Sequence, residues 1–513
     1  MSVFSLRVFC LAAVLATFGV ARADDFTDRL NEAYANIPEN RRAENVLIPA
    51  LALMDEPPAV LLGRADRVLL LTPSSPIWAS ASAWAQAQPQ QDMLDAIKQV
   101  TQEDNPRRAM VFAMPYGIRG IPTDWVRKGL NAELGDPPTI AGAKLGYLDR
   151  LAWVETLVHI EATRLVDEGQ PDQAMELVFH MALLGRMLAD RSLEREVSWG
   201  MHAMRTAMLR LRDITYVDSK HDHALTSEFL VDMVKKIDVR RGMFRLDRIR
   251  MPLGDQIAAE QMIGRVFAPT GQPDSAVFPT AMAELAATDR PLRLFAESGK
   301  WQKLEAGHAS KQDTAEKLRA IFDDWAIRWE ADQFDPTFRT PTEYEKLSTS
   351  SFGLIAEIVP DIGALHVLRR ELETEIIGTR LALAIEALTI ESGGSLPSDL
   401  YLIRPRYIDD LGVDPYNANR ASNNKPPYQY FVPERDTVGG RLHVMNVIPQ
   451  SRTNFSVTLG REDFVLYSLG GNEFDDRAVD VSDSGLEPAG DYLIWPPVIS
   501  LLREYLEQEG ASE

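Results

Sequence analysis

A short acidic loop near the C-terminus carries the residues best suited to metal chemistry. The stretch Leu469–Asp476 reads LGGNEFDD, so two flexible glycines precede one amide and three carboxylates. Calcium takes about six to eight oxygen ligands from such groups and tolerates loose geometry. The side chains that could supply oxygens are Asn472, Glu473, Asp475 and Asp476, with Asp480 and Asp483 further on. The alternative is a solvated acidic turn without a metal.

Two arrangements of histidines have spacings that resemble those of metal sites. His221 and His223 have the His-x-His spacing of some metal sites, but they lie in a polar stretch that favours an exposed loop. His159-Ile-Glu161 lacks the second histidine of a zincin helix, so no metalloprotease is indicated. The chain also has no G-x-S-x-G, no phosphate-binding P-loop and no G-x-G-x-x-G. The sequence therefore predicts no catalytic constellation.

The order of features between residues 376 and 478 is distinctive. The features are Ala384–Leu388 at a helix end, Ser392–Pro397, Tyr407–Leu411, Asp414–Tyr416, Tyr428–Tyr430 and Leu466–Gly470, followed by Asp475 and Asp476. This order resembles the soluble domain of the major pseudopilins of type II secretion, and it covers about 100 of the 513 residues. The helical part before it resembles uncharacterised bacterial exported proteins.

The resemblance implies a small α+β domain, in which a long helix accompanies short antiparallel strands, and a calcium ion at the acidic loop. It implies that Leu469 offers its carbonyl and that Asp475 and Asp476 offer their side chains. Together with Asn472 these residues form the predicted metal site, with calcium as the expected ion. Residues 1–30 lack the prepilin-peptidase site of that family, so polymerisation into a filament is not expected.

Residues 1–23 have the three parts of a cleavable secretory signal peptide. The first part carries one positive charge, Arg7, and the second part, Val8–Val20, is apolar. In the third part, Ala21 and Ala23 place small residues at the two positions that a signal peptidase requires before the cleavage point. The apolar run of about 13 residues is shorter than the roughly 20 of a membrane span, although an uncleaved anchor is the alternative. We expect cleavage after Ala23, a location in the periplasm or outside the cell, and no integral membrane span in the mature chain.

The amino-acid composition excludes several kinds of chemistry and several classes of partner. Cys10, the only cysteine, lies in the signal peptide, so disulfides and thiol chemistry are excluded from the mature chain. The net charge of the whole chain is −21, and removal of Arg7 and Arg22 with no acid lowers it by two. Such a negative chain is poorly suited to nucleic acid or anionic lipid. We expect a protein partner, still unidentified, and no nucleic acid.

Helical periodicity dominates the middle of the chain. Apolar residues recur at three- and four-residue steps from about residue 146. Gly169 is expected to end one helix and Pro171 to begin the next. This hairpin resembles a tetratricopeptide unit, but no second copy follows at a fixed period, and two ordinary antiparallel helices are the alternative. By contrast, Arg67–Thr72 is predicted as a strand, and Ile362–Ser392 as a long helix that stops at two glycines.

The predicted fold is therefore mainly α, with a small α+β domain at the C-terminus. Its parts are a signal peptide 1–23, a mixed and irregular region 24–145, a helical domain 146–332, a polar linker 333–351, and a long helix with the pseudopilin-like domain at 352–513. The predicted function is that of an exported structural or protein-interaction protein. The alternative is an extracytoplasmic hydrolase, which a deep pocket holding His159 or His180 with two carboxylates would favour.

Overall fold

The computed structural model describes residues 23–509 with short gaps. The residues left out within that span are 64, 104–107, 222, 239, 241–243, 288–293, 332–333, 418–426, 438, 450–453, 462 and 486–489. The predicted signal peptide lies outside the described residues except for Ala23, at which the first helix begins.

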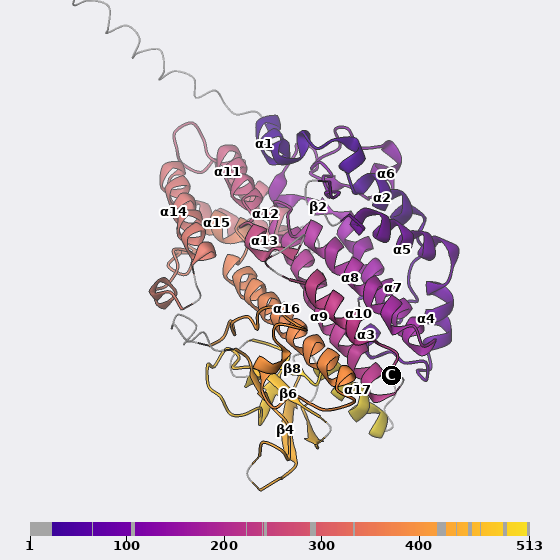
Figure 1. The fold of residues 1–513 in the computed structure, drawn as a ribbon. Coiled ribbons are helices and arrows are strands. Elements are labelled where there is room, and N and C mark those ends of the chain that lie inside the picture. Colours follow the sequence, from indigo (N-terminus) through magenta and orange to yellow (C-terminus); the bar gives the residue numbers. More distant parts are fainter. Residues whose placement is uncertain are drawn as a thin grey trace, which may run out of the picture.

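The fold is mainly α-helical, as predicted, and a small sheet lies at its C-terminal end (Figure 1). The first helices are α1 (Ala23–Ala35), α2 (Glu44–Leu53), α3 (Ala65–Leu70), α4 (Trp78–Ala85), α5 (Gln88–Thr101) and α6 (Thr123–Arg127). After a ribbon of β1 (Ala132–Glu133) and β2 (Lys144–Leu145) come α7 (Gly146–Asp167), α8 (Pro171–Leu188), α9 (Glu194–Lys220), α10 (Ser227–Lys236), α11 (Gly254–Val266), α12 (Phe278–Ala287), α13 (Leu294–Glu305) and α14 (Lys311–Glu330). The last helices are α15 (Gly353–Ile358), α16 (Ile362–Glu391) and α17 (Val498–Gln508).

Helices α7 and α8 form the hairpin expected around Gly169. This glycine has a φ of +72°, the left-handed conformation that commonly ends a helix. Pro171 occupies the first turn of α8, where its missing N–H group has no partner to lose. Helix α8 then packs closely on α9, because a Cβ atom on Gly185 would lie only 2.7 Å from the Gly200 carbonyl oxygen. Glycines thus allow the two backbones to touch in the helical body.

The prediction of a strand at Arg67–Thr72 was wrong. Ala65–Leu70 forms α3, which lies against α7 and α17. Val68 and Leu71 are buried in the main core, and Leu70 joins a second, smaller core. A short apolar run is compatible with a strand or with a buried helix, and here the neighbouring helices decided the outcome.

The C-terminal strands form one six-stranded sheet. They are β3 (Gln429–Phe431), β4 (His443–Ile448), β5 (Phe455–Leu459), β6 (Val465–Ser468), β7 (Asp480–Ser482) and β8 (Asp491–Trp495), in the order β3-β6-β8-β7-β4-β5. The expected antiparallel pairing is found for β3 with β6, β6 with β8 and β4 with β5. Strand β7 instead runs parallel to both its neighbours, so the sheet is mixed and not antiparallel throughout.

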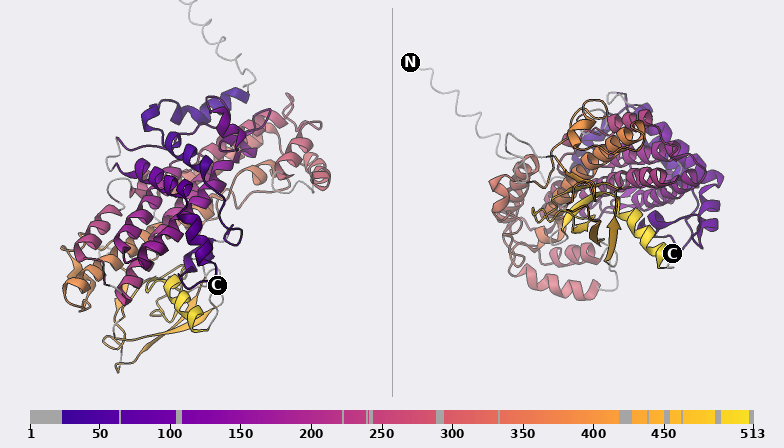
Figure 2. Two further views of the ribbon diagram at one scale, coloured as in Figure 1. Left: turned by 90° about the vertical axis from the view of Figure 1, so that its right-hand side faces the viewer. Right: turned by 60° about the horizontal axis from the view of Figure 1, so that its bottom comes forward.

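Helix α16 lies between this sheet and the helical body (Figures 1 and 2). A Cβ atom on Gly378 would lie 2.5 Å from Ile494 of β8, so the helix and the sheet are in close contact. On the other side of α16, Thr379 donates a hydrogen bond to the Met208 carbonyl of α9 at 3.4 Å. The main core continues through this contact, and the second core lies between the sheet and α17.

The polar segment that follows α14 contacts that helix. Arg328 donates to the Thr337 carbonyl at 2.8 Å, and Lys317 pairs with Glu343 at 2.9 Å. Among the helices that the structure describes, none combines the length and the apolar character needed to cross a bilayer.

Candidate functional site

Charged residues of α9 attach the C-terminal module, defined as residues 352–513, to the helical body. Arg212 pairs with Glu375 of α16, and both side chains are fully buried. The Glu375 carboxylate also accepts a hydrogen bond from the Tyr492 hydroxyl of β8 at 2.6 Å. At the end of α9, Lys220 pairs with Asp463 at 2.6 Å. Because buried charges are tolerated when they are paired, these contacts fix the module against α9.

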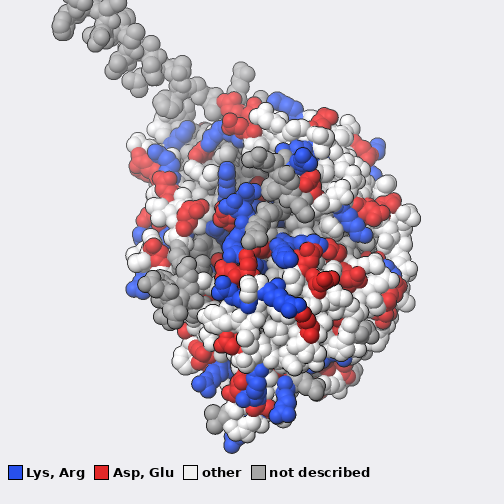
Figure 3. Space-filling model, in the orientation of Figure 1, with Lys and Arg blue, Asp and Glu red and all other residues white. Residues whose placement is uncertain are grey.

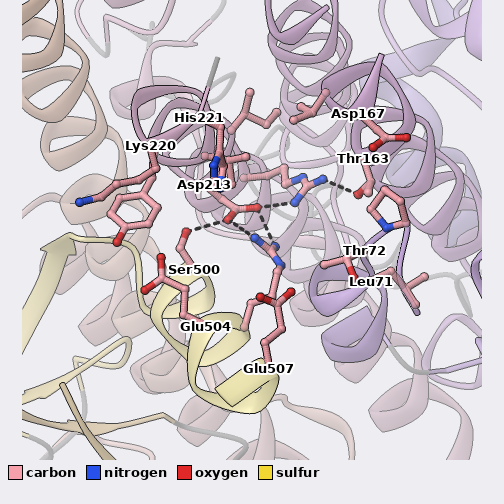
Figure 4. Close-up of a pocket in the computed structure, with 17 residues that line it drawn as sticks. Leu71, Thr72, Thr163, Asp167, Asp213, Lys220, His221, Ser500, Glu504 and Glu507 are labelled. Atoms are coloured by element: carbon pink, nitrogen blue, oxygen red, sulfur yellow. Dashed lines mark hydrogen bonds and ion pairs between the residues drawn. The ribbon is translucent and has the colours of Figure 1, made fainter. Parts of the chain in front are cut away.

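Asp213, the next residue of α9, lies at the centre of a buried network (Figure 4). Its carboxylate accepts hydrogen bonds from Ser500 at 2.7 Å and from two nitrogens of Arg503 at 2.9 and 3.0 Å, and Arg210 also pairs with it. Arg503 donates further to the Leu69 carbonyl at 2.7 Å. Burial alone raises the pKa of Asp213, but Arg503 and Arg210 hold it below its ordinary value. Asp213 is therefore ionised near neutral pH.

A pocket of about 360 Å³ opens beside this network, between α3, α7, α9 and α17 (Figure 4). Its ionisable lining residues besides the network are Asp167, Lys220, His221, Glu504 and Glu507. The Ser500 hydroxyl donates to Asp213, and a carboxylate with a lowered pKa is a weak base. The Ser500–Asp213 contact therefore holds α17 in place and does not activate the serine as a nucleophile.

Neither histidine named for the hydrolase alternative lines this pocket. Burial and the charge of Arg210 lower the pKa of His159 to about 3, so its ring is neutral. Glu155 lies 4.0 Å from that ring, and burial raises the pKa of its carboxyl to about 7. His180 bonds to Thr101 at 2.8 Å. The two histidines named for the hydrolase alternative are therefore not part of this pocket, whose histidine is His221.

The predicted metal-site residues lie in the turn that follows β6. The Asp475 carboxylate accepts hydrogen bonds from the Tyr467 hydroxyl at 2.8 Å and from the Arg477 N–H at 2.9 Å. Asp476 accepts the Val479 N–H at 3.1 Å, and Asn472 accepts the Phe474 N–H at 3.0 Å. Each bond uses one oxygen of its side chain. The turn therefore orders these side chains and leaves Asp475 a second oxygen, whereas the Asp476 side chain also interacts with the Asp491 carboxyl.

Asp491, at the start of β8, is a further acidic residue of this region that sequence reasoning missed. It is fully buried, and one oxygen accepts the Ala478 N–H at 2.8 Å while Oδ1 has no hydrogen-bond partner. Burial first, and then the carboxylates of Asp476 and Asp475, raise its pKa well above the ordinary value. An acid inside the otherwise apolar run Asp491–Trp495 was the available signal.

The donor set of this region suits calcium in kind, because every candidate ligand is an oxygen. The buried Asp491 Oδ1, which has no partner of its own, is consistent with a cation at this place. Among the residues that the structure describes, however, no three histidine, cysteine or carboxylate side chains are already assembled as a metal site.

His221 and His223 lie exposed at the end of α9, as predicted for that polar stretch. No protein-family model, curated protein or solved structure matches the chain.

Proposed function

We propose that this chain is an exported structural or protein-interaction protein without its own catalytic activity, and that a surface at the end of the C-terminal sheet where β4 and β7 begin binds a protein partner. The observation that carries the proposal is a group of exposed apolar side chains at that end of the two strands. The exposed fractions are 68% for Phe474, 55% for Leu442, 52% for Val444 and 43% for Val479. Single exposed apolar residues are ordinary, whereas grouped ones are typical of interaction sites.

Hydrogen bonds join two of the segments that carry these residues. The Asn446 N–H donates to the Val479 carbonyl at 2.7 Å, and the His443 ring bonds to the Ala478 carbonyl at 2.9 Å. The start of β4 therefore lies beside the end of the acidic turn that carries Phe474. We call this surface the acidic edge, defined by Leu442, Val444, Phe474, Asp475, Asp476 and Val479. Arg441 and Arg477, both exposed, adjoin these residues in the chain, and acidic and basic side chains are interspersed at the lower end of the face drawn in Figure 3. The surface therefore suits a partner with apolar and charged side chains.

Calcium belongs to the same proposal. The Leu469 carbonyl and the side chains of Asn472, Asp475 and Asp476 would hold it, with Asp491 as an additional ligand. A bound divalent cation would neutralise carboxylates that otherwise repel each other. The chain's own residues would then hold Phe474 and Val479 in one arrangement, which lowers the entropy lost when a partner binds.

The position of α16 supports a role outside a filament. In a pseudopilin the apolar assembly helix is continuous with the helix of the soluble domain. Here α16 begins at Ile362 directly after α15 and packs against α9 and α10. A pseudopilin-like module enclosed in this way is suited to contact other proteins through the exposed surface at the start of β4 and β7. Export through the N-terminal signal peptide is part of the proposal and would bring this surface to the cell envelope.

Co-purification from the native cell envelope tests this function. We would compare the wild-type chain with Phe474→Ser/Val479→Ser and with the control Ile327→Ser, because Ile327 of α14 is 64% exposed and lies outside the acidic edge. The proposal predicts a specific partner that is retained by the control and lost from the double variant. Equal recovery of that partner with both variants would contradict the assignment of the surface.

A further inference from the structure

A second and larger cavity lies between the ends of α9 and α16 and the C-terminal sheet. Its volume is about 1060 Å³, at the upper end of the range of ligand sites. One wall is aromatic: Phe464 stacks on Trp495 with ring centres 5.1 Å apart, and Tyr216 meets Trp495 edge-on at 5.5 Å. This cavity is large enough for an organic molecule. Only 1% of Phe464, 3% of Trp495 and 5% of Tyr216 is exposed, so the wall offers apolar contact over small parts of these rings.

Glu386 of α16 lines the same cavity. Only 7% of this residue is exposed, and no hydrogen bond to its carboxylate is found among the described residues. Burial raises its pKa to about 7. A buried carboxylate without a hydrogen-bond donor is costly, so such a group is expected to have an external partner.

The other charged groups of the cavity already have partners. Lys220 pairs with Asp463, although its charge also lowers the pKa of Glu386. Arg435 binds Asp436 through two nitrogens at 2.8 Å each. The Asp218 carboxylate accepts the backbone N–H groups of residues 224 and 225. Arg461 lies 3.9 Å from Glu434, and its side chain is largely exposed. The buried group left for a ligand is therefore a carboxylate beside an aromatic wall.

We propose that this cavity binds an organic cation, a protonated amine on an apolar body, whose ammonium group pairs with Glu386. Aromatic faces attract cations and apolar groups alike, and tryptophan does so most strongly. The apolar body would contact Phe464, Trp495 and Tyr216. Such a ligand supplies the hydrogen-bond donors that Glu386 lacks. This site is separate from the acidic edge, so it does not depend on the proposed partner.

Calorimetric titration of the mature full-length chain at pH 8 tests the site. The three probes share an apolar ring. Phenethylamine carries an amine, 3-phenylpropionate carries a carboxylate, and phenylalanine carries both groups. The variants are Glu386→Gln and the control Glu507→Gln, which removes a carboxylate from the neighbouring pocket. Gln is similar in shape to Glu and avoids a buried charge, so the first variant is expected to fold. Trp495 fluorescence gives a second readout of occupancy.

Phenethylamine should bind the wild type and Glu507→Gln equally, and it should bind Glu386→Gln at least about tenfold more weakly, because a charge-assisted hydrogen bond is lost. Comparable binding of phenylalanine would assign the free amino group of an amino acid or peptide as the ligand, whereas weaker binding would assign a simple amine. The proposal is overturned if phenethylamine does not bind at millimolar concentration, if Glu386→Gln binds it unchanged, or if 3-phenylpropionate binds more tightly.

Discussion

Asp213 and Arg503 are separated by 290 residues in the chain and form a buried ion pair with two hydrogen bonds, of 2.9 and 3.0 Å. The pair joins α9, in the middle of the helical body, to α17, the last helix of the chain. Because α17 also covers one face of the C-terminal sheet, this contact fixes the position of the sheet. The acidic edge is therefore held in a fixed position relative to the helical body.

Replacing Arg503 by methionine should destabilise the protein by about 3 kcal/mol, near the lower end for a broken buried pair. Asp213 would remain buried and charged, with only Arg210 and Ser500 as partners. The midpoint of urea denaturation measures the effect. The control is Arg29→Met, which removes an exposed pair with Glu260 and should cost at most about 1 kcal/mol. Equal midpoints for the two variants would refute a structural role of the network.

Replacing either of two helix glycines by alanine should change the stability of the fold, in opposite directions. One glycine lies in the close contact between α16 and β8, and the other faces free space. Gly378→Ala should destabilise the fold by about 1–3 kcal/mol, because the new methyl group meets Ile494 at 2.5 Å. Gly264→Ala on α11 has free space and should stabilise by up to about 1 kcal/mol through helix propensity. Thermal melts of both variants give the comparison. Adding Ile494→Ala to the first variant should relieve the overpacking, and an unchanged melting temperature for Gly378→Ala would contradict the packing.

The raised pKa of Glu386 predicts that the stability of the protein depends on pH. Burial and Asp218 raise its pKa, while Lys220 lowers it, and the result is about 7 in the folded protein. An acid whose pKa is raised by folding costs nothing below its unfolded pKa of about 4.3, and the cost grows as pH rises toward 7. Glu386→Gln should therefore match the wild type near pH 4. At pH 8 it should be more stable, by on the order of 3 kcal/mol. Melting curves at the two pH values, without added amine, check this sign.

The calcium proposal predicts a ligand-dependent melting temperature. Calcium at about 100 times its dissociation constant should stabilise the wild type by about 2.7 kcal/mol relative to chelator. Asp475→Ala/Asp476→Ala should abolish the shift. Asp92→Ala/Asp95→Ala, which removes two exposed acids from α5, should keep it. A wild type that melts identically with calcium and with chelator would rule out the metal.

The variant Asp491→Asn distinguishes two possible partners of the Asp491 carboxylate, a bound cation and a proton shared with a neighbouring carboxylate. In chelator at pH 8 this variant should melt higher than the wild type, because it removes a buried acid whose pKa is raised. In calcium it should melt lower than the wild type, because a ligand is lost. A variant that melts higher under both conditions would indicate that Asp491 is held by a proton alone.

The elements with strong local signals were predicted well. The long helix expected over Ile362–Ser392 is α16, Ile362–Glu391, because Asp361 caps its start and two glycines follow its end. The helical hairpin expected around Gly169 and Pro171 is formed by α7 and α8. Both depend on residues within a few positions of the helix ends, where sequence patterns are informative.

The features that depend on distant contacts were not predictable in the same way. Asp213 and Glu386 occupy helix positions that look like ordinary surface charges, and their burial depends on elements far along the chain. Asp491 was missed because β8 was not expected as a strand. Likewise, the apolar residues of α3 gave no indication that helices rather than strands would lie beside them.

Photo-crosslinking in the native organism tests the central claim most directly. A benzophenone amino acid would replace Phe474 in one strain and Ile327 in another, since both side chains are exposed to a similar extent. The proposed function predicts one discrete crosslinked partner from position 474, weakened by a calcium chelator, and none from position 327. No crosslink from position 474, or the same products from both positions, would contradict a partner at the acidic edge.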